Sequence, residues 1–401
     1  MHLANLTLEQ FRPYERLELV VPPQGLRITG RNASGKTSVL EALVLLSTTR
    51  SSRATFDREL VRWSSGIEYG LPPYARVEGI IHTGSDTGGD VRHAIDISIE
   101  VDGTLDNHAR KRYRLDQQSI RAQDLVGVLK CVLFSPEDVL LVSGPPADRR
   151  RQIDILASQI DRNYLQALTR FGKVLSQRNS LLKSFARERI QPRDSSAIAQ
   201  LTFWDEQLVG PAAYLVTARL LSTARLTELI AHRSANLMDG AAIEFRYIPK
   251  MAVPEFMVGE HAATTRQRVG AALTEQLRAV RVDEFRRGLT LVGPHRDDFV
   301  FAIDGRELSL YGSRGQQRLG ILAYKLSEGD LIAEMTGERP ILLLDDVLSE
   351  LDSVHRDLIL RGVKANNCQL LVTSTDAMLL DHPALHHLPL MVAENGDIGL
   401  A

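Results

Sequence analysis

The stretch G-R-N-A-S-G-K-T at residues 30–37 decides the fold, because it matches the phosphate-binding pattern G-x-x-x-x-G-K-[ST]. An apolar-alternating run at 26–29 precedes it and predicts a strand, and a helix-favouring run at 38–46 follows it. Strand, glycine-rich turn and helix together favour a nucleotide-binding loop over a chance match. The residues expected to bind ATP are Gly30, Arg31, Asn32, Ala33, Ser34, Gly35, Lys36 and Thr37.

Two side chains of this loop carry the chemistry. Lys36 is expected to neutralise the β- and γ-phosphates, which also makes it a candidate catalytic residue. The Thr37 hydroxyl is expected to ligate Mg²⁺. The backbone amides of the loop and of the following helix N-terminus would surround the phosphate anion.

Residues 341–346, I-L-L-L-D-D, predict a second element of the same site. Four consecutive aliphatic residues are typical of a strand buried on both faces of a parallel sheet. Asp345 is then expected to hold Mg²⁺, and Asp346 to orient or deprotonate the attacking water as a catalytic residue. A core strand that ends in a polar turn would give the same pattern, but the loop at 30–37 in the same chain favours the functional interpretation.

Two short motifs flank this acidic strand. The S-R-G-Q run at 313–316 leads into an apolar helix at 319–331, and a Ser-x-Gly at a helix start can bind an anion. In an ATP-sandwich dimer it would cap the γ-phosphate bound by the other subunit, whereas an ordinary helix N-cap is the alternative. The residues concerned are Ser313, Arg314, Gly315 and Gln316, followed after the acidic strand by Ser349 and Asp352.

Length and composition predict a folded two-lobed protein. The chain has 401 residues, 44% of them hydrophobic, and no apolar run approaches the roughly 18 residues of a membrane span. No membrane partner is therefore expected. Its two cysteines, Cys131 and Cys368, lie in apolar contexts and are expected to be reduced thiols of a cytoplasmic protein.

Between the two halves of the nucleotide site the hydrophobic period becomes helical. An apolar stripe from 153 to 175 predicts one long helix, and a second helix carries apolar residues from 201 to 221. Pro211 should kink or end this second helix. The stripe is short for an independent coiled coil, so an antiparallel helical subdomain is favoured.

This helical region is basic although the whole chain has a net charge of −2. Residues 149–193 contain eleven Lys or Arg against three Asp or Glu, a local net charge of +8. Such a helix can follow a phosphate backbone without reading bases, although a solvated helix face is the alternative. Aromatic residues are scarce there, so duplex DNA or a single-strand/duplex junction is favoured over single strands. The candidate DNA-binding residues are Arg149, Arg150, Arg170, Lys173, Arg178 and Lys183.

In this order the motifs resemble the RecF family, which belongs to the SMC-like branch of the ABC-type ATPases of DNA maintenance. The resemblance runs over nearly the whole chain, and its two specific strings are G-P-H-R-D-D at 293–298 and S-R-G-Q-Q-R at 313–318. The other matching segments are F-R at 11–12, V-L-F-S-P-E-D at 132–138, R-R at 149–150, L-D-D at 344–346 and S-E-L-D at 349–352.

The resemblance implies an α/β fold, with an ABC-type ATPase head whose mixed sheet carries the P-loop and whose sequence is split by an inserted helical arm. The expected divisions are 1–143 and 288–401 for the head and 144–287 for the arm. It identifies 313–316 as a signature motif acting in trans, and Ser349 and Asp352 as the D-loop. The roles of His295 and Arg296 stay open between sensing nucleotide, touching DNA and holding a turn.

The function implied is an ATP-dependent DNA clamp in recombinational repair and in replication of gapped DNA. It would form a homodimer on ATP and Mg²⁺, act as a slow DNA-stimulated ATPase, and bind recombination mediator proteins at the nucleoid.

Some positions depart from the pattern of this family or of ABC ATPases generally. Ala33 stands where glycine is usual in the family, a modest change if the residue has negative φ. Asp346 replaces the usual ABC glutamate, as in RecF proteins, and the switch histidine is replaced by L-L-V-T-S-T-D at 370–376. No Q-loop glutamine stands near 132–138. These departures favour slow hydrolysis.

Other classes fit less well. A different SMC-like protein would carry much longer coiled coils. A nucleotide-binding subunit of a membrane transporter would carry the switch histidine and a transporter-type signature. An overcoming-lysogenization-type nuclease would need a further domain, and only 49 residues follow Asp352.

Overall fold

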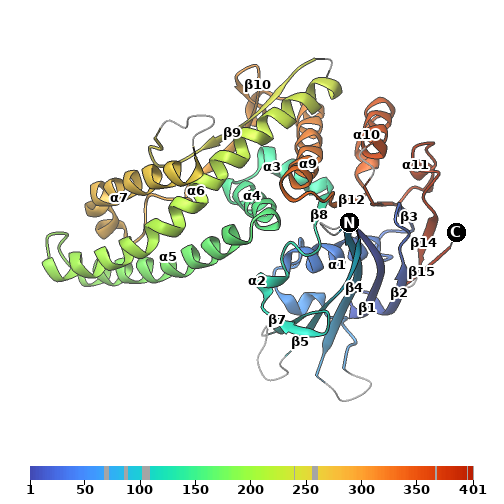
Figure 1. The fold of residues 1–401 in the computed structure, drawn as a ribbon, viewed down its shortest axis with the longest axis horizontal. Coiled ribbons are helices and arrows are strands. Elements are labelled where there is room, and N and C mark those ends of the chain that lie inside the picture. Colours follow the sequence, from blue (N-terminus) through green and yellow to red (C-terminus); the bar gives the residue numbers. More distant parts are fainter. Residues whose placement is uncertain are drawn as a thin grey trace. The chain divides into compact units, whose positions relative to one another are not determined.

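The computed structural model describes residues 1–66, 72–84, 89–101, 109–238, 240–254, 261–365, 368–394 and 396–400. The chain forms two compact units (Figure 1). Unit 1 comprises residues 1–138 and 321–401, and unit 2 comprises residues 139–320. The helical unit is therefore larger than the expected 144–287, because residues 288–320 belong to it.

A mixed sheet in unit 1 carries the nucleotide motifs. Its strand order is β15-β14-β3-β13-β12-β8, and all neighbours are parallel except β14 and β15. All five residues of β12 are buried, as expected for a central strand with aliphatic side chains on both faces. The strands span Gly25–Thr29 (β3), Cys131–Phe134 (β8), Ile341–Asp345 (β12), Leu370–Ser374 (β13), Leu390–Glu394 (β14) and Asp397–Leu400 (β15).

A second sheet of unit 1 is antiparallel, with the order β2-β1-β4-β5-β6-β7. Helix α1 (Lys36–Thr48) is buried along most of its length, and its side chains share one apolar core with both sheets. Burial on several sides suits a helix whose sequence is almost entirely apolar after residue 38. The strands span His2–Phe11 (β1), Tyr14–Val20 (β2), Tyr74–Gly84 (β4), Asp90–Val101 (β5), Ala109–Leu115 (β6) and Gln118–Ile120 (β7).

Unit 2 is built on four long helices, α4 (Pro146–Ile160), α5 (Arg162–Glu188), α6 (Ser195–Leu237) and α7 (Ala262–Arg287). The expected single helix through 153–175 is wrong, since the chain leaves the helical conformation at Asp161 with φ −132° and ψ 108°. The Asp161 side chain then accepts a hydrogen bond from the backbone N–H of Asn163 at 2.8 Å and caps α5. Helix α6 continues through Pro211 to Leu237, so the proline does not end it.

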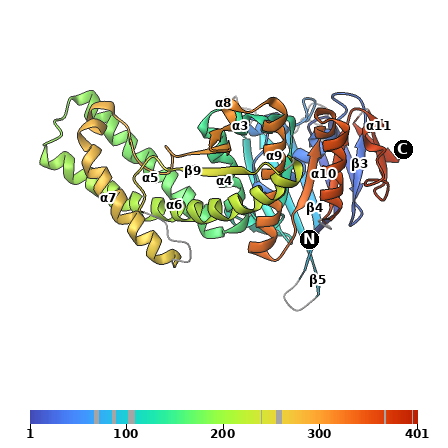
Figure 2. The same ribbon diagram turned by 90° about the horizontal axis from the view of Figure 1, so that it is seen from above.

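Helices α5, α6 and α7 pack side by side in both views (Figures 1 and 2). Their shared core contains Phe171 of α5, Leu208 and Leu215 of α6, and Leu273 of α7. With a third helix covering the seam, the pair α5–α6 belongs to a helical subdomain rather than a free coiled coil.

A small antiparallel sheet explains why residues 288–320 join the helical unit. Strand β10 (Asp298–Ile303) pairs along its whole length with β9 (Ile243–Ile248), which follows α6, and also with β11 (Arg306–Glu307).

The other helices of the described residues in both units are α2 (Ala122–Leu125), α3 (Leu140–Ser143), α8 (Leu308–Tyr311), α9 (Arg314–Thr336), α10 (Ser353–Ala365) and α11 (Ala377–Leu380), with 3₁₀ turns at Asp57–Leu60, Pro136–Val139 and Val347–Glu350.

Both cysteines are free thiols, Cys131 buried and Cys368 half-buried. Burial raises the pKa of each thiol to about 11. Within the described parts of the chain, no helix is both long enough and apolar enough to span a bilayer.

Candidate nucleotide site

The loop at 30–37 joins the carboxyl end of β3 to the first residue of α1. Gly35 has φ 103°, and a Cβ on it would lie 2.4 Å from the Tyr14 hydroxyl oxygen. No other residue fits this position, because the backbone is left-handed and the tyrosine ring closes the space. The N-terminus of α1 then presents backbone N–H groups to an anion.

Ala33 also has positive φ, 65°. The expectation of a modest departure required negative φ, so that expectation is wrong. A residue with a Cβ in the left-handed region is strained by about 1–2 kcal/mol. The loop of this chain therefore holds local strain at Ala33.

The Lys36 side chain folds back into the loop. It is 6% exposed, and its Nζ donates to the carbonyl oxygens of Gly30 at 2.7 Å and Arg31 at 2.8 Å. Burial lowers the pKa of the Lys36 amine, while the charges of Asp346 and Asp345 oppose that shift. The ammonium is thus held at the mouth of the loop, where a phosphate oxygen can exchange for a carbonyl.

Thr37 and Asp345 meet from opposite halves of the sequence. The Thr37 Oγ1 donates to Asp345 Oδ1 at 2.9 Å, and the carboxylate is 7% exposed. Burial raises the pKa of Asp345, and hydrogen bonds from Thr373 and Thr37 oppose the rise. Mg²⁺ usually takes one or two protein carboxylates and completes its octahedron with phosphate oxygens and water, so a hydroxyl beside a carboxylate fits it.

Asp346 sits in a cradle formed by the end of β13. Its Oδ1 accepts hydrogen bonds from the Ser374 hydroxyl at 3.4 Å and from the Thr375 backbone N–H at 3.3 Å. Its own φ is 52°, a left-handed conformation that aspartate tolerates better than longer side chains. The backbone therefore favours the shorter carboxylate, and Ser374 and Thr375 contact it where an ABC switch histidine is absent.

The expected signature motif at 313–316 starts α9 with reciprocal hydrogen bonds. The Gln316 backbone N–H donates to the Ser313 hydroxyl at 3.2 Å, and the Ser313 N–H donates to Gln316 Oε1 at 2.9 Å. This is a capping box, so the motif has the helix-cap role that was its alternative interpretation. Gly315 is exposed, and a Cβ on it would meet only the Ser313 hydroxyl oxygen, at 3.9 Å. The fold of the chain does not itself require glycine there.

Ser349 and Asp352, the two residues expected to form a D-loop, lie in the turns that follow β12. The Ser349 hydroxyl donates to the Asp346 carbonyl oxygen at 2.6 Å. Asp352 caps α10, accepting from the backbone N–H groups of Val354 and His355, each at 3.0 Å. Hydrogen bonds from His355 lower the pKa of Asp352. Both side chains are exposed.

The six basic residues expected to contact DNA fall into two groups. Arg170, Lys173 and Lys183 are exposed on α5. Arg149 is committed to Asp298 by two hydrogen bonds of 2.8 and 2.9 Å. The half-buried Arg150 donates to the Asp297 carbonyl oxygen at 2.7 Å, and burial lowers its pKa.

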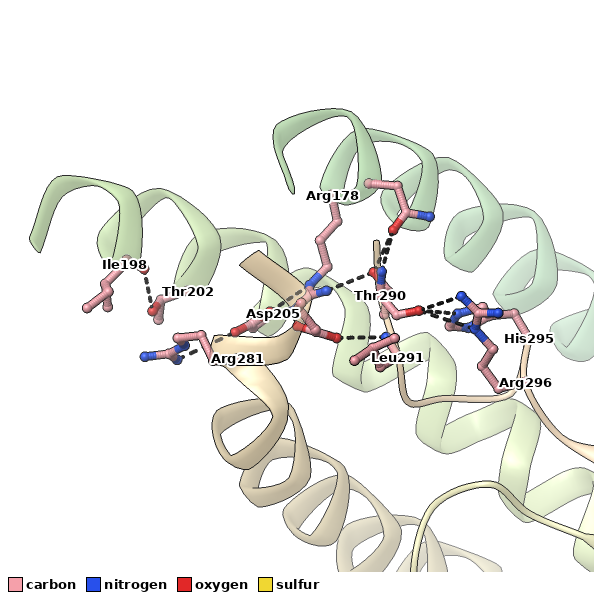
Figure 3. A network of polar contacts seen from close by, with 11 residues as sticks. Arg178, Ile198, Thr202, Asp205, Arg281, Thr290, Leu291, His295 and Arg296 are labelled. Atoms are coloured by element: carbon pink, nitrogen blue, oxygen red, sulfur yellow. Dashed lines mark hydrogen bonds and ion pairs between the residues drawn. The ribbon is translucent and has the colours of Figure 1, made fainter. Parts of the chain in front are cut away.

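The prediction that Arg178 contacts DNA is wrong, because its side chain is fully buried and is engaged in a network of polar contacts (Figure 3). Its guanidinium donates to Asp205 at 2.8 Å, to Glu284 at 2.6 Å and to the Thr290 hydroxyl at 2.7 Å. These partners lie on α6, on α7 and in the segment after α7. Arg178 thus joins three elements of unit 2 around one buried charge.

The G-P-H-R-D-D motif at 293–298 supplies a second buried arginine with partners. Arg219 of α6 is 2% exposed and donates to the Pro294 carbonyl oxygen at 2.7 Å and to Asp154 at 2.8 Å. It also lies 3.5 Å from Asp297, which is fully buried. Burial raises the pKa of Asp297.

The histidine of the same motif, His295, contacts Thr290, which is also a partner of Arg178. His295 Nε2 lies 3.3 Å from the Thr290 carbonyl oxygen, and Arg296 donates to that oxygen at 3.0 Å (Figure 3). Burial lowers the pKa of His295 to about 4, so the ring is neutral at physiological pH. Three roles were left open for His295 and Arg296. Their contacts with the Thr290 carbonyl oxygen are those expected for residues that hold a turn.

Sequence reasoning identified the residues of 370–376 only as a departure from a pattern. It did not single out Thr373, whose hydroxyl lies 2.8 Å from Asp345. The available signal was topological, since neighbouring parallel strands bring their carboxyl ends to one edge. That signal needs the strand order, which the sequence does not give.

Comparison with known proteins agrees with these motifs. The family model "RecF/RecN/SMC N terminal domain" matches residues 2–390. A DNA replication and repair protein RecF from Thermomicrobium roseum is 45% identical over 404 aligned positions, covering 99% of each chain. The RecF protein of Bacillus subtilis strain 168 is 35% identical, with the same coverage of both chains.

Solved structures show the same fold. A structure described as the recombination mediator protein RecF with ATPrS in the RecFOR pathway matches with a TM-score of 0.83 and 27% identity, covering 100% of this chain and 98% of that one. An Smc head domain from Pyrococcus furiosus, solved with the C-terminal domain of ScpA, matches with a TM-score of 0.53 at 14% identity, which concerns the fold alone.

Proposed function

This chain belongs to the RecF family of DNA replication and repair proteins, and on that premise we propose that it is an ATP-dependent DNA clamp. Two copies close on two ATP molecules and hold DNA at gaps during recombinational repair and replication. Slow hydrolysis opens the pair, so ATP acts as a timer. Recombination mediator proteins are its expected partners at the nucleoid.

The nucleotide half of the proposal rests on the meeting of Lys36, Thr37 and Asp345 at one edge of the mixed sheet. The hydroxyl and carboxylate 2.9 Å apart supply oxygen ligands for Mg²⁺, and the ammonium supplies the positive charge that a triphosphate requires. Asp346 accepts hydrogen bonds from Ser374 and Thr375 at the same edge, which supports our proposal that it orients the attacking water.

The dimer half rests on one observation above all, the exposed glycine of the signature motif. Gly315 is the second residue of a 23-residue helix, and glycine has a lower helix propensity than alanine. Neither backbone conformation nor packing within the chain requires glycine there. Because glycine has no side chain, a group from outside the chain can come close to the backbone of Gly315. We propose that this group is the γ-phosphate of an ATP bound to a second copy.

The DNA half rests on the outer side of α5. Between Arg162 and Arg187 the helix contains no Asp or Glu. Its exposed basic residues include Arg170, Lys173 and Lys183. With Arg178 and Arg149 assigned to internal ion pairs, these exposed residues are the part of the predicted set that we propose contacts phosphates.

Replacing Lys173 and Lys183 together by alanine is expected to weaken duplex binding without changing nucleotide binding. Each lost phosphate contact should lower the slope of log affinity against log salt by about 0.9, so the pair should remove about 1.8. Fluorescence anisotropy with labelled duplex at several salt concentrations, in the presence of ATP, measures this slope.

The matched control removes two exposed arginines elsewhere in unit 2. Arg225 of α6 and Arg246 of β9 each pair with a neighbouring glutamate, and alanine at both deletes the same charge. If the control lowers the salt slope as much as the lysine variant, α5 is not the contact surface. Gel shifts on single-stranded, duplex and gapped DNA, with and without ATP, test the proposed clamp function. DNA binding of equal strength with and without ATP would contradict that function.

A further inference from the structure

We infer that Thr373 is a positioning residue that holds the carboxylate of Asp345 in place for metal binding. The inference deepens the proposed function, on which it rests, by naming a residue on which Mg²⁺ loading of the nucleotide site depends. It is carried by the strand order, by the hydrogen bonds of one hydroxyl and by its burial.

Strand β13 lies between the two strands that carry the nucleotide motifs. It pairs with β12 on one side, where Thr373 is opposite Asp345. It pairs with β3 on the other side, where Ser374 is opposite Thr29, the residue before the P-loop. Thr373 is therefore at the edge of the sheet between the loop and the acidic residue, and its side chain is fully buried.

The Thr373 hydroxyl has defined partners. It donates to Asp345 Oδ1 at 2.8 Å and lies 3.4 Å from the Leu344 carbonyl oxygen. It also accepts a hydrogen bond from the Asp346 backbone N–H at 3.2 Å. One buried hydroxyl is thus bonded to the side chain of one carboxylate residue and to the backbone of the next.

Two hydroxyls donate to the same oxygen of Asp345, and only one of them belongs to the loop. Thr37, at 2.9 Å, is the residue expected to give its oxygen to the metal. When its hydroxyl turns to a cation, Thr373 is the donor that remains on Asp345 Oδ1. Without Thr373 the buried carboxylate would lose its second fixed partner and would be free to rotate away from the ligand position.

Replacing Thr373 by valine removes the hydroxyl with little change of volume. The residue then still fits β13, but within the described residues the hydrogen bond from Thr37 is the one that remains on the Asp345 carboxylate. Outer partners of metal ligands commonly change metal affinity by about 10- to 100-fold. We therefore expect Thr373→Val to raise the Mg²⁺ concentration needed for half-maximal tightening of nucleotide binding by about 10-fold or more.

The experiment measures binding of a fluorescent ATP analogue as Mg²⁺ is titrated, so it does not depend on turnover. Thr373→Ser, which keeps the hydroxyl, should recover most of the wild-type midpoint. Thr336→Val removes another threonine hydroxyl of unit 1, one whose hydrogen bonds in the described residues are with backbone groups of Ile332 and Glu338, and it should leave the midpoint unchanged. Nucleotide affinity in EDTA should differ less than twofold among the four proteins.

An unchanged Mg²⁺ midpoint in Thr373→Val would overturn the inference while leaving the proposed function intact. An equal loss of nucleotide affinity with and without Mg²⁺ would also overturn it, since that result indicates general damage to the sheet. If the valine variant does not fold, Thr373→Ala supplies the same comparison. Wild-type protein that binds no nucleotide in either condition would refute the proposed function and this inference with it.

Discussion

Replacing Lys36 by methionine is expected to abolish ATP-driven dimerisation, and with it stable DNA binding. Methionine keeps an unbranched side chain of nearly the same length and removes the ammonium that is held at the mouth of the loop. Charge-assisted hydrogen bonds to phosphate contribute about 1.5–3 kcal/mol each, so ATP affinity should fall about 100-fold or more. Sedimentation velocity with ATP and Mg²⁺ should then show only monomer.

The matched control is Arg16→Met on β2, which removes an exposed cation of unit 1 whose partner is the exposed Glu18. It should dimerise with ATP as the wild type does. Dimers of Lys36→Met that form with ATP at the wild-type concentration would mean that association does not depend on the phosphate loop.

Replacing Arg178 by methionine is expected to destabilise unit 2 by about 3–5 kcal/mol. The arginine is fully buried, and its loss leaves the carboxylates of Asp205 and Glu284 without their shared countercharge. Denaturant unfolding followed by tryptophan fluorescence measures the effect selectively. Of the two tryptophans, Trp63 is 93% exposed in unit 1, whereas Trp204 packs against the core of unit 2, so the signal change reports unit 2.

Two further variants separate this charge effect from a change of helix surface. Lys173→Met, on the exposed side of the same helix, should change stability by less than about 0.5 kcal/mol. Adding Glu284→Gln to Arg178→Met should recover part of the loss, because the amide still accepts the Leu291 N–H without carrying a buried charge. If Arg178→Met unfolds at the wild-type denaturant concentration, the network is not structural, and a surface role for Arg178 is open again.

Much of the nucleotide site was predictable because its parts are local. The loop at 30–37 is read from eight consecutive residues, and the four aliphatic residues before Asp345 indicate a central parallel strand by composition alone. The two motifs could also be expected to lie close together, because each follows the carboxyl end of a strand that is typical of a parallel sheet. The structure shows this in the hydrogen bond between Thr37 and Asp345, which are 308 positions apart.

The basic helix was predictable only in outline, because sequence shows charge and not which face of the helix is covered. Arg178 and Lys173 lie five residues apart on α5, yet one is fully buried and the other exposed. What decides between them is the position of Asp205 and Glu284 on α6 and α7, 27 and 106 residues away along the chain. Positive charge that appeared available to DNA is partly used to hold the helices together.

Backbone conformation was the other limit. Ala33 and Asp346 both have positive φ, at 65° and 52°. Neither residue type predicts a left-handed backbone as glycine does. The break at Asp161 is similar, since the apolar stripe continues across it and only the cap geometry ends α4. Such positions depend on tertiary contacts that periodicity does not record.

Sharing of ATP between two copies is tested most directly by mixing two defective variants. Lys36→Met has an intact signature motif, and Gly315→Glu has an intact loop but a side chain and charge where the γ-phosphate of the other copy should approach. Each should be monomeric with ATP and Mg²⁺ when alone. Mixed in equal amounts they should form a heterodimer in sedimentation velocity, because one complete composite site is restored. If Gly315→Glu dimerises alone with ATP, or if the mixture stays monomeric while each variant is folded, nucleotide is not shared across a subunit boundary.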